Sequence, residues 1–201
     1  MKKTNKQVQE DIMKEYVLQI NKKVTKNSRK IKKAIEPILF DAVLDCPEME
    51  SVRSGTLKYD LGLTIDPSRD IAEAVAKSTQ IITRKFTYTA GAIRGGTSVK
   101  IQPKTYLNIL SLPKSVVITE KGAVLPWADW MINYGDSIII SDFGVKYTDA
   151  GRTGGAIMVQ GSRVFRIDPT YSGTEEDNFI SRALNTRIPD IESRIWQIIL
   201  S

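Results

Sequence analysis

The side chains that could carry out chemistry are isolated carboxylates and a single thiol. Histidine is absent from the 201 residues, which excludes Ser-His-Asp and Cys-His nucleophile systems, histidine-based metal sites and the usual general base near neutral pH. The aspartates of the second half stand singly, without the paired spacing typical of glycosidases or two-metal nucleases. The five aspartates considered are Asp129, Asp136, Asp142, Asp149 and Asp168. We therefore expect no catalytic activity, no metal and no cofactor, with a nuclease whose carboxylates meet only in the fold as the open alternative.

One cysteine and two glycine-rich segments are the other candidates for chemistry. Cys46 cannot form an internal disulfide, and we expect a small core side chain rather than a reactive thiol. Gly91 and Gly96 have the spacing of a phosphate-binding loop, but Thr97 stands where that loop needs lysine, so we expect a hairpin loop. Residues 151–155, with Arg152 among them, could bind an anion through backbone N–H groups, although a flexible connection between strands is expected.

Two tryptophans, Trp127 and Trp130, lie three residues apart. Pro126 before them and Gly135 after them bracket a short helix on which the two side chains share one face. Such a pair could stack on nucleic-acid bases. Because the predicted helix lies between predicted strands, we instead expect both side chains to pack in the core or in a subunit interface.

The positive charge of the chain is concentrated near its beginning. The net charge at pH 7 is +6, and residues 1–33 contain eleven basic and three acidic residues. This segment therefore carries +8 and the remaining residues carry −2. Such an asymmetry indicates contact with nucleic acid or with an acidic protein surface, or else a solvated helix face. We keep, as an alternative function, a basic nucleic-acid-binding protein that uses residues 1–33.

The first segment is predicted to be a helix over residues 5–24, with a narrow apolar stripe at every fourth position. The stripe consists of Val8, Ile12, Tyr16, Ile20 and Val24. Residues 27–28 are expected to end this helix and to cap a second one, which Pro37 kinks or restarts. The pattern predicts an αα-hairpin or a kinked helix. Because the stripe is too narrow to fill a core, we expect this arm to be an assembly element outside the folded core.

The rest of the chain alternates helix and strand signals. Residues 45–48 and 66–70 are expected to begin helices, and residues 174–177 to cap a helix that continues to residue 184, before a last helix over 190–200. Alternating β-branched and aromatic residues predict strands over 82–88, 97–101, 115–119, 137–140 and 143–147. A hairpin is expected from residues 156–159 and 163–167 around a turn at 160–162.

These elements predict an α+β fold with an N-terminal helical arm or αα-hairpin, a mainly antiparallel sheet with a crossing helix, and C-terminal helices. We expect two parts, a basic helical arm over 1–48 and an α+β domain over 49–201. No apolar run approaches the ~18–20 residues that span a bilayer, and no apolar segment typical of a signal peptide follows the basic start. We therefore expect no membrane partner and a protein that stays in the cytoplasm where it is made.

Three stretches of the second half form a pattern in their order and spacing. The first is residues 125–127 with Trp130 and residues 135–136, and the second is residues 152–154 followed by 156–158. The third runs over residues 165–174 and continues through 177–180 and 182–184. Together they resemble the tail-completion and neck (head–tail connector) proteins of tailed bacteriophages. Residues 52–57 are similar to a short Arg-Thr-Gly-x-Leu signature near the front of such proteins.

The chain departs from that family pattern at three positions. Phe165 and Phe179 stand where the pattern has tryptophan, which keeps an aromatic side chain for packing. Asp168 stands where it has the first of two prolines, so the local turn differs. The resemblance covers about residues 50–186 and leaves the first ~48 residues unmatched.

The resemblance implies a structural protein that forms a ring between the portal vertex and the tail tube, without catalysis. It implies a place in the virion at the neck, reached after assembly in the host cytoplasm. Its partners would be other copies of the chain, other neck proteins, the portal or adaptor, the tail terminator or tail tube, and DNA in the channel. Assembly contacts are expected at Trp127, Trp130, Arg152, Thr153, Gly154, Arg166, Pro169, Tyr171, Asp177, Asn178 and Arg182. Arm contacts are expected at Val8, Ile12, Tyr16, Ile20, Lys22, Lys23, Lys26, Arg29 and Lys30.

Overall fold

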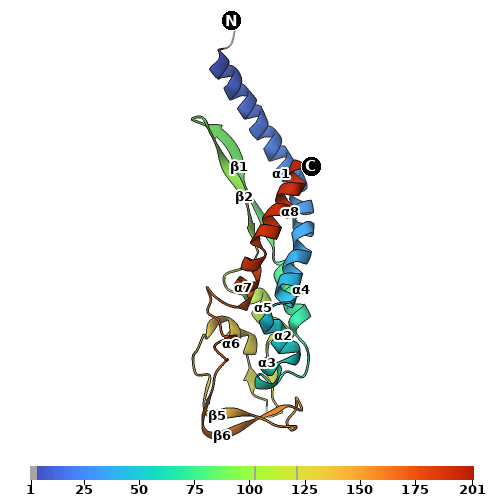
Figure 1. The fold of residues 1–201 in the computed structure, drawn as a ribbon, viewed down its shortest axis with the longest axis vertical. Coiled ribbons are helices and arrows are strands. Elements are labelled where there is room, and N and C mark those ends of the chain that lie inside the picture. Colours follow the sequence, from blue (N-terminus) through green and yellow to red (C-terminus); the bar gives the residue numbers. More distant parts are fainter. Residues whose placement is uncertain (1–3, 102, 121) are drawn as a thin grey trace.

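The protein is elongated, with a long helix at one end and a two-stranded sheet at the other (Figure 1). The structure is a computed structural model that describes residues 4–101, 103–120 and 122–201. It confirms the predicted α+β class, with a long N-terminal helix, antiparallel strand pairs, a crossing helix and C-terminal helices. Within these described residues, the strands form three separate two-stranded antiparallel sheets, which pair β1 with β2, β3 with β4 and β5 with β6.

The elements follow one another in a fixed order along the chain. The helices are α1 Asn5–Leu44, α2 Pro47–Ser54, α3 Thr56–Asp60, α4 Ser68–Lys77, α5 Leu107–Leu110, the 3-10 turn η1 Pro113–Ser115, α6 Trp127–Asn133, α7 Phe179–Thr186 and α8 Ile188–Leu200. The strands are β1 Gln80–Thr89, β2 Ala92–Lys100, β3 Val117–Ile118, β4 Val124–Leu125, β5 Ile140–Tyr147 and β6 Ala156–Phe165. Helices α2 and α4 begin where the sequence predicted, with Pro47 in the first turn of α2.

Helix α1 is continuous, so the predicted break at residues 27–28 and the αα-hairpin are wrong. Thr4 and Gln7 begin the helix with a capping box, which satisfies two of its free N–H donors. The Ser28 hydroxyl donates to the Thr25 carbonyl at 3.1 Å, and the Asn27 amide reaches the Ile198 carbonyl. Both polar side chains are therefore accommodated without ending the helix. Pro37 also lies inside α1.

The buried face of α1 differs from the predicted stripe. Val8, Ile12 and Tyr16 are 44%, 62% and 54% exposed. The side chains that α1 buries are Val17, Val24, Ile31, Ile35, Leu39 and Val43. This face continues through the position of the predicted break, and packing on other elements holds the helix together there. Tertiary packing therefore overrides the local capping signal.

The second half of α1 belongs to the main core, which corrects the expectation of an arm outside it. Ile35, Leu39 and Val43 pack in one cluster with Trp127 of α6 and Phe179 of α7. A smaller cluster joins Val24 and Ile31 to Ile198 and Ile199 of α8. The predicted boundary at residue 48 thus does not separate two cores, and only the first turns of α1, before Val17, are free of buried apolar residues.

Strands β1, β2 and β6 are longer than the turn signals predicted, whereas β3 keeps only two residues of the strand predicted over 115–119. Ala90 and Gly91 form the whole β1–β2 turn, with φ of 52° and 78°, as the two-residue turns of twisted hairpins require. Residues 92–96 therefore belong to β2 and not to a loop. The predicted turn at 160–162 is a bulge inside β6, where the register shifts opposite Asp142. Residues 137–139, predicted to be a strand, precede β5.

The crossing helix α6 buries both predicted tryptophans, as expected from its Pro-to-Gly bracket. Trp127 is fully buried and Trp130 is 6% exposed. The Trp130 ring meets Phe165 edge to face, with 5.9 Å between ring centroids, a favourable arrangement of aromatic quadrupoles. Helix α7 begins later than predicted, because the Asn178 side chain accepts from the N–H groups of Ile180 and Ser181. The segment 174–177 closes a turn before this cap.

Leu39→Ala should lower the free energy of unfolding by about 2–5 kcal/mol, because it opens a cavity under a fully buried side chain. The matched control Val8→Ala, on the exposed start of the same helix, should change it by less than about 0.5 kcal/mol. Urea denaturation followed by circular dichroism measures both. Equal losses for the two variants would contradict the assignment of the buried face.

Candidate assembly surface

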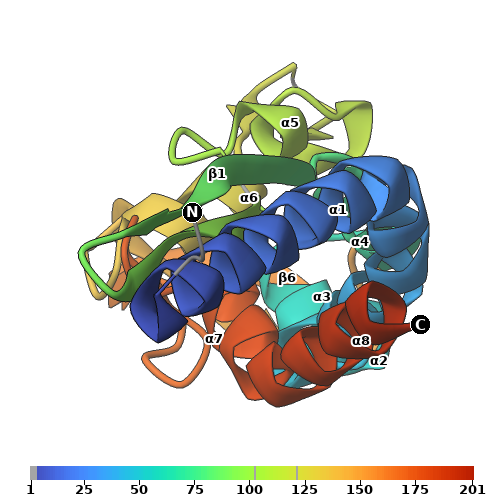
Figure 2. The ribbon, with the colours of Figure 1, turned by 90° about the horizontal axis from the view of Figure 1, so that it is seen from above.

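The first half of α1, the β1–β2 hairpin and α8 together form one end of the molecule (Figures 1 and 2). α1 packs against both β1 and α8, although these are far apart in sequence. Between the three lies a groove of about 620 Å³, called here the arm groove. Its apolar lining includes Tyr16 and Ile20 of α1, Phe86 of β1, and Ile195 and Trp196 of α8.

Large apolar side chains remain exposed around the arm groove. Trp196 is 58% and Leu200 is 72% exposed, and Tyr16 links them to Ile12 and Val8 along α1. Single exposed apolar residues are normal on protein surfaces, whereas a group of them beside a groove marks an interaction site. This end of the molecule, called here the arm end, therefore presents an apolar surface that the described residues leave exposed.

One asparagine ties the hairpin to α1 and so shapes the arm groove. The register of β1 shifts between Arg84 and Thr87, where the ladder to β2 is interrupted. The Asn21 carboxamide donates to the Phe86 carbonyl and accepts from the Phe86 N–H, both at 2.8 Å. Gly95 has φ +130° opposite this point, and a Cβ there would lie 2.6 Å from the Lys85 carbonyl oxygen. The β1 bulge, its hydrogen bonds to Asn21 and the close approach at Gly95 therefore depend on one another.

A second apolar groove lies at the opposite end, between α3, the β3–β4 pair and the β5–β6 sheet. This distal groove has a volume of about 600 Å³, and Phe143, Val145 and Met158 line it. The Tyr147 hydroxyl donates to Asp60 at 2.6 Å and holds β5 to α3. Burial, followed by this hydrogen bond, raises the pKa of Tyr147 to about 12. Burial likewise raises the pKa of Asp60.

In the described parts of the chain, no group of three or more acidic or cysteine side chains is placed to hold a metal ion. Cys46 is buried at the start of α2, and burial raises the pKa of its thiol to about 12. The thiol is thus held in its unreactive protonated form at neutral pH.

Several predicted interface residues lie instead in the interior, where they join the resembling stretches to one another. The Asn178 side chain is buried and donates to the Tyr106 hydroxyl and the Thr174 carbonyl, each at 2.9 Å. Gly135 donates to the Gly173 carbonyl at 2.8 Å. A Cβ at Gly173 would lie 2.6–2.7 Å from Asn178 and from the Met131 carbonyl oxygen. The Gly-Thr and Asp-Asn pairs of the third stretch are therefore needed by the fold.

Arg182 is an internal link between α7 and α2. Its Nη2 lies 2.8 Å from the carboxylate of Glu48, whose side chain is 7% exposed. The same guanidinium donates to the Ser172 carbonyl and lies 3.4 Å from Asp177. A buried carboxylate needs such a partner, because an unpaired buried charge is costly. Arg182, like the buried Trp127, Trp130 and Asn178, makes its contacts within the subunit. The residue pattern at these positions therefore reflects folding.

The remaining predicted contact residues lie at the surface. Arg152 is exposed in the β5–β6 loop, and its Nη1 donates to the Ile118 carbonyl at 3.3 Å, beside the distal groove. Thr153 is half-buried, and Gly154 is exposed with φ +69°. Arg166, Pro169 and Asp177 are exposed and Tyr171 is half-buried. Of the predicted arm contacts, Ile20 is half-buried and the others are exposed. The exposed ones are Val8, Ile12, Tyr16, Lys22, Lys23, Lys26, Arg29 and Lys30.

Sequence reasoning missed Asn21, Phe86, Trp196 and Leu200, which shape or line the arm end. No local motif marks Asn21, because its partner lies 65 residues away. For Trp196 a signal existed, since a helix that buries Ile191, Ile198 and Ile199 leaves Trp196 on a different face.

No family model, curated protein or solved structure matches this chain.

Among the described helices, none combines the length and apolar character needed to cross a bilayer.

Asn21→Ala should free the β1–β2 hairpin, because both backbone groups of Phe86 lose their partner. The free energy of local opening should fall by about 1–3 kcal/mol, measured by hydrogen exchange over residues 80–100. Asn21→Asp should also weaken the link, since its second oxygen faces the Phe86 carbonyl. Asn27→Ala is the control, because its amide bonds α8 and not the hairpin. Unchanged exchange in Asn21→Ala would show that the hairpin is held by other contacts.

Cys46 should be almost inert to thiol reagents at pH 8 in the folded protein and should react fully in denaturant. The raised pKa also predicts a stability effect, because the protonated thiol contributes fully below its unfolded pKa of about 8.5. This contribution is lost as pH rises from there towards about 12. Cys46→Ala should therefore flatten the alkaline limb of the stability curve. Rapid native labelling at pH 8 would contradict the burial.

Proposed function

We propose that this chain is a structural subunit of the neck or tail-completion complex of a tailed phage, without enzymatic activity. In this role, copies would form a ring that joins the portal side to the tail, in the virion and first in the host cytoplasm. The resemblance of residues 50–186 to that family motivates the proposal. The observation that carries it is the presence of two separate apolar grooves at opposite ends of one elongated subunit.

Two different surfaces are what a ring requires of its subunit. In a two-fold dimer the same patch meets itself, whereas a closed ring repeats one heterologous contact between unlike patches. The arm groove and the distal groove are unlike in structure, since one lies between helices and a hairpin and the other borders the β5–β6 sheet. Exposed Ile118, Val124 and Met158 continue the apolar surface near the distal end.

The strand pairs favour the same interpretation. Each of the three sheets has only two strands, and a two-stranded pair is marginal in water unless another surface covers it. Their free edges can also accept a strand from a neighbour. β1 is exposed along much of its length, so the hairpin gains most from burial against another subunit. The aromatic side chains Tyr16, Phe86 and Trp196 supply the anchors typical of interface centres.

Sedimentation velocity and light scattering test the proposal over a range of protein concentrations. We expect a large oligomer of defined size, and we expect Trp196→Ser with Leu200→Ser to shift it towards monomer while circular dichroism shows that the subunit stays folded. Ile65→Ser is the matched control, because Ile65 is 66% exposed but lies in the loop before α4.

Trp196 also reports association directly. Because Trp127 and Trp130 are buried already, a shift of tryptophan emission to shorter wavelength on association should come from Trp196 and should vanish in Trp196→Ser. A chain that remains monomeric at high concentration, with Trp196 open to a collisional quencher, would contradict the ring. Oligomers that form equally in the double variant would place the contact elsewhere.

A further inference from the structure

The cations of α1 are gathered on the side of the helix that faces away from the core. At about 100° per residue, six of them fall within roughly 120° of the circumference, approximately opposite Val24 and Ile31. All six reach solvent, and we call them the cation face. They are Lys22, Lys23, Lys26, Arg29, Lys30 and Lys33.

The chain offers little acidic charge to this surface, with Glu192 of α8, which lines the arm groove together with Lys23, as the exception. α1 has no acidic residue between Glu15 and Glu36. Within the described residues, no ion pair joins any member of the cation face, and the nearest pair on α1 is Lys32 with Glu36 at 4.0 Å. The hairpin residues 80–100 beside α1 also contain no acidic residue. The positive potential of the face is therefore left for a partner.

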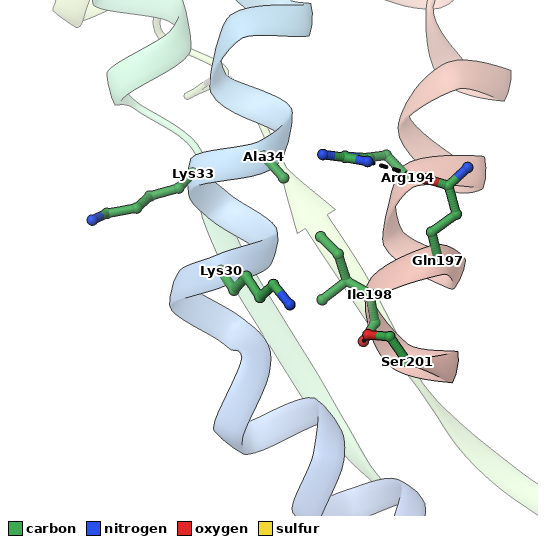
Figure 3. Close-up of a pocket in the computed structure, with 7 residues that line it drawn as sticks. All are labelled: Lys30, Lys33, Ala34, Arg194, Gln197, Ile198 and Ser201. Carbon is green, nitrogen blue, oxygen red and sulfur yellow. Dashed lines mark hydrogen bonds between the residues drawn. The ribbon is translucent and has the colours of Figure 1, made fainter.

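Helix α8 adds a cation from across a groove. Lys30, Lys33 and Arg194 line a hollow of about 430 Å³ between α1 and α8. Figure 3 shows the Lys30 ammonium and the Arg194 guanidinium directed into the space between the helices, whereas Lys33 points away from it. Arg194 is oriented by a 3.1 Å bond from its Nη1 to Gln197. One flank of the cation face thus continues onto a second element.

We infer that the cation face, with Arg194, binds the phosphate backbone of nucleic acid. Six charges over eleven steps of helix give about one per 3 Å along the axis, close to the ~3.4 Å between phosphates along one DNA strand. Between Lys22 and Lys33 the only apolar residues are Val24 and Ile31, and both are buried. The face therefore lacks the apolar anchors that protein interfaces need. This absence favours nucleic acid over an acidic protein.

The inference does not depend on the proposed ring. The apolar surface around the arm groove, Tyr16, Trp196 and Leu200 in particular, is separate from the six cations, although Lys23 borders both. A monomeric variant, Trp196→Ser with Leu200→Ser, should bind nucleic acid as the single subunit does. Failure of the ring and failure of nucleic-acid binding would therefore be seen in different measurements.

The test is fluorescence anisotropy with a labelled DNA duplex of about 25 base pairs and a single strand of the same length, at about 50–200 mM salt. We expect micromolar binding at the low-salt end, with the logarithm of affinity falling linearly with the logarithm of salt concentration. Comparison of the two probes decides whether duplex or single strand is the preferred source of the phosphates.

Charge-reversal variants locate the site. Lys26→Glu, Arg29→Glu and Lys33→Glu together should lower affinity at least tenfold and reduce the salt slope by about 2–3, because each phosphate that a cation neutralises adds about 0.9 to the slope. Lys146→Glu, Arg152→Glu and Arg163→Glu together, on the β5–β6 sheet and its loop at the far end, are the charge-matched control and should change affinity less than threefold. Arg194→Gln should weaken binding two- to threefold, and Arg187→Gln on the start of α8 should not. Unchanged circular dichroism confirms that each variant is folded.

Three outcomes would overturn the inference. The first is no binding of either probe at about 50 mM salt, where non-specific electrostatic binding is strongest. The second is an equal loss of affinity in the triple variant and in the far-end control, which would indicate net charge and not a face. The third is displacement of DNA by poly-glutamate at equal charge concentration, which would identify the cation face as a surface for acidic protein.

Discussion

The burial of one face of α1 is the constraint on which the rest of the structure depends. From Val17 to Val43 this face contacts β1, α8, α4 and the main core, so a single helix joins the arm end of the molecule to the main core. Burial of each large aliphatic side chain contributes about 1.5–3 kcal/mol, enough to outweigh the local signals at residues 27–28 and Pro37. Because the buried face is fixed, the orientation of the opposite face is fixed too. The exposed apolar residues at the start of the helix and the cation face therefore owe their exposure to the packing of the other side.

The arm end depends on a second, local arrangement. The β1 bulge leaves the Phe86 backbone without a strand partner, and the Asn21 carboxamide replaces that partner with two hydrogen bonds. The hairpin is thereby held beside α1 at its bulge, and Phe86 is brought to Tyr16 and Trp196. Asn21 thus fixes β1 beside α1 at the arm groove. Asn178 likewise makes several contacts with one side chain. Its side-chain oxygen caps α7, and its amide donates to the Thr174 carbonyl and to the Tyr106 hydroxyl.

Much of the fold could be predicted from the sequence, and the errors have identifiable causes. Proline and glycine located α2 and α6, and alternation located β1 and β5, because these signals act within a few residues. The turn predicted at 160–162 failed because a glycine can serve a bulge as well as a turn, and only the pairing with β5 distinguishes them. The predicted interface residues Trp127, Trp130 and Asn178 are interior, and Arg182 is half-buried and bonded within the chain. A pattern of residues does not reveal whether packing is within one chain or between chains. At the arm, Val8 and Ile12 are exposed as a contact surface requires.

The sequence by itself determined the α+β class, the burial of Cys46 and both tryptophans of α6, the absence of histidine chemistry and the basic character of the first 33 residues. These follow from composition and from periodicity, which are local properties. The tertiary structure decided which side of α1 is buried, how Asn21 meets Phe86, and that Arg194 joins Lys30 across 164 residues of chain. These features depend on contacts between segments that are distant in sequence. A helix with apolar residues at spacings of both four and seven offers more than one face for burial. Which face is chosen depends on the shapes of the elements that pack against it.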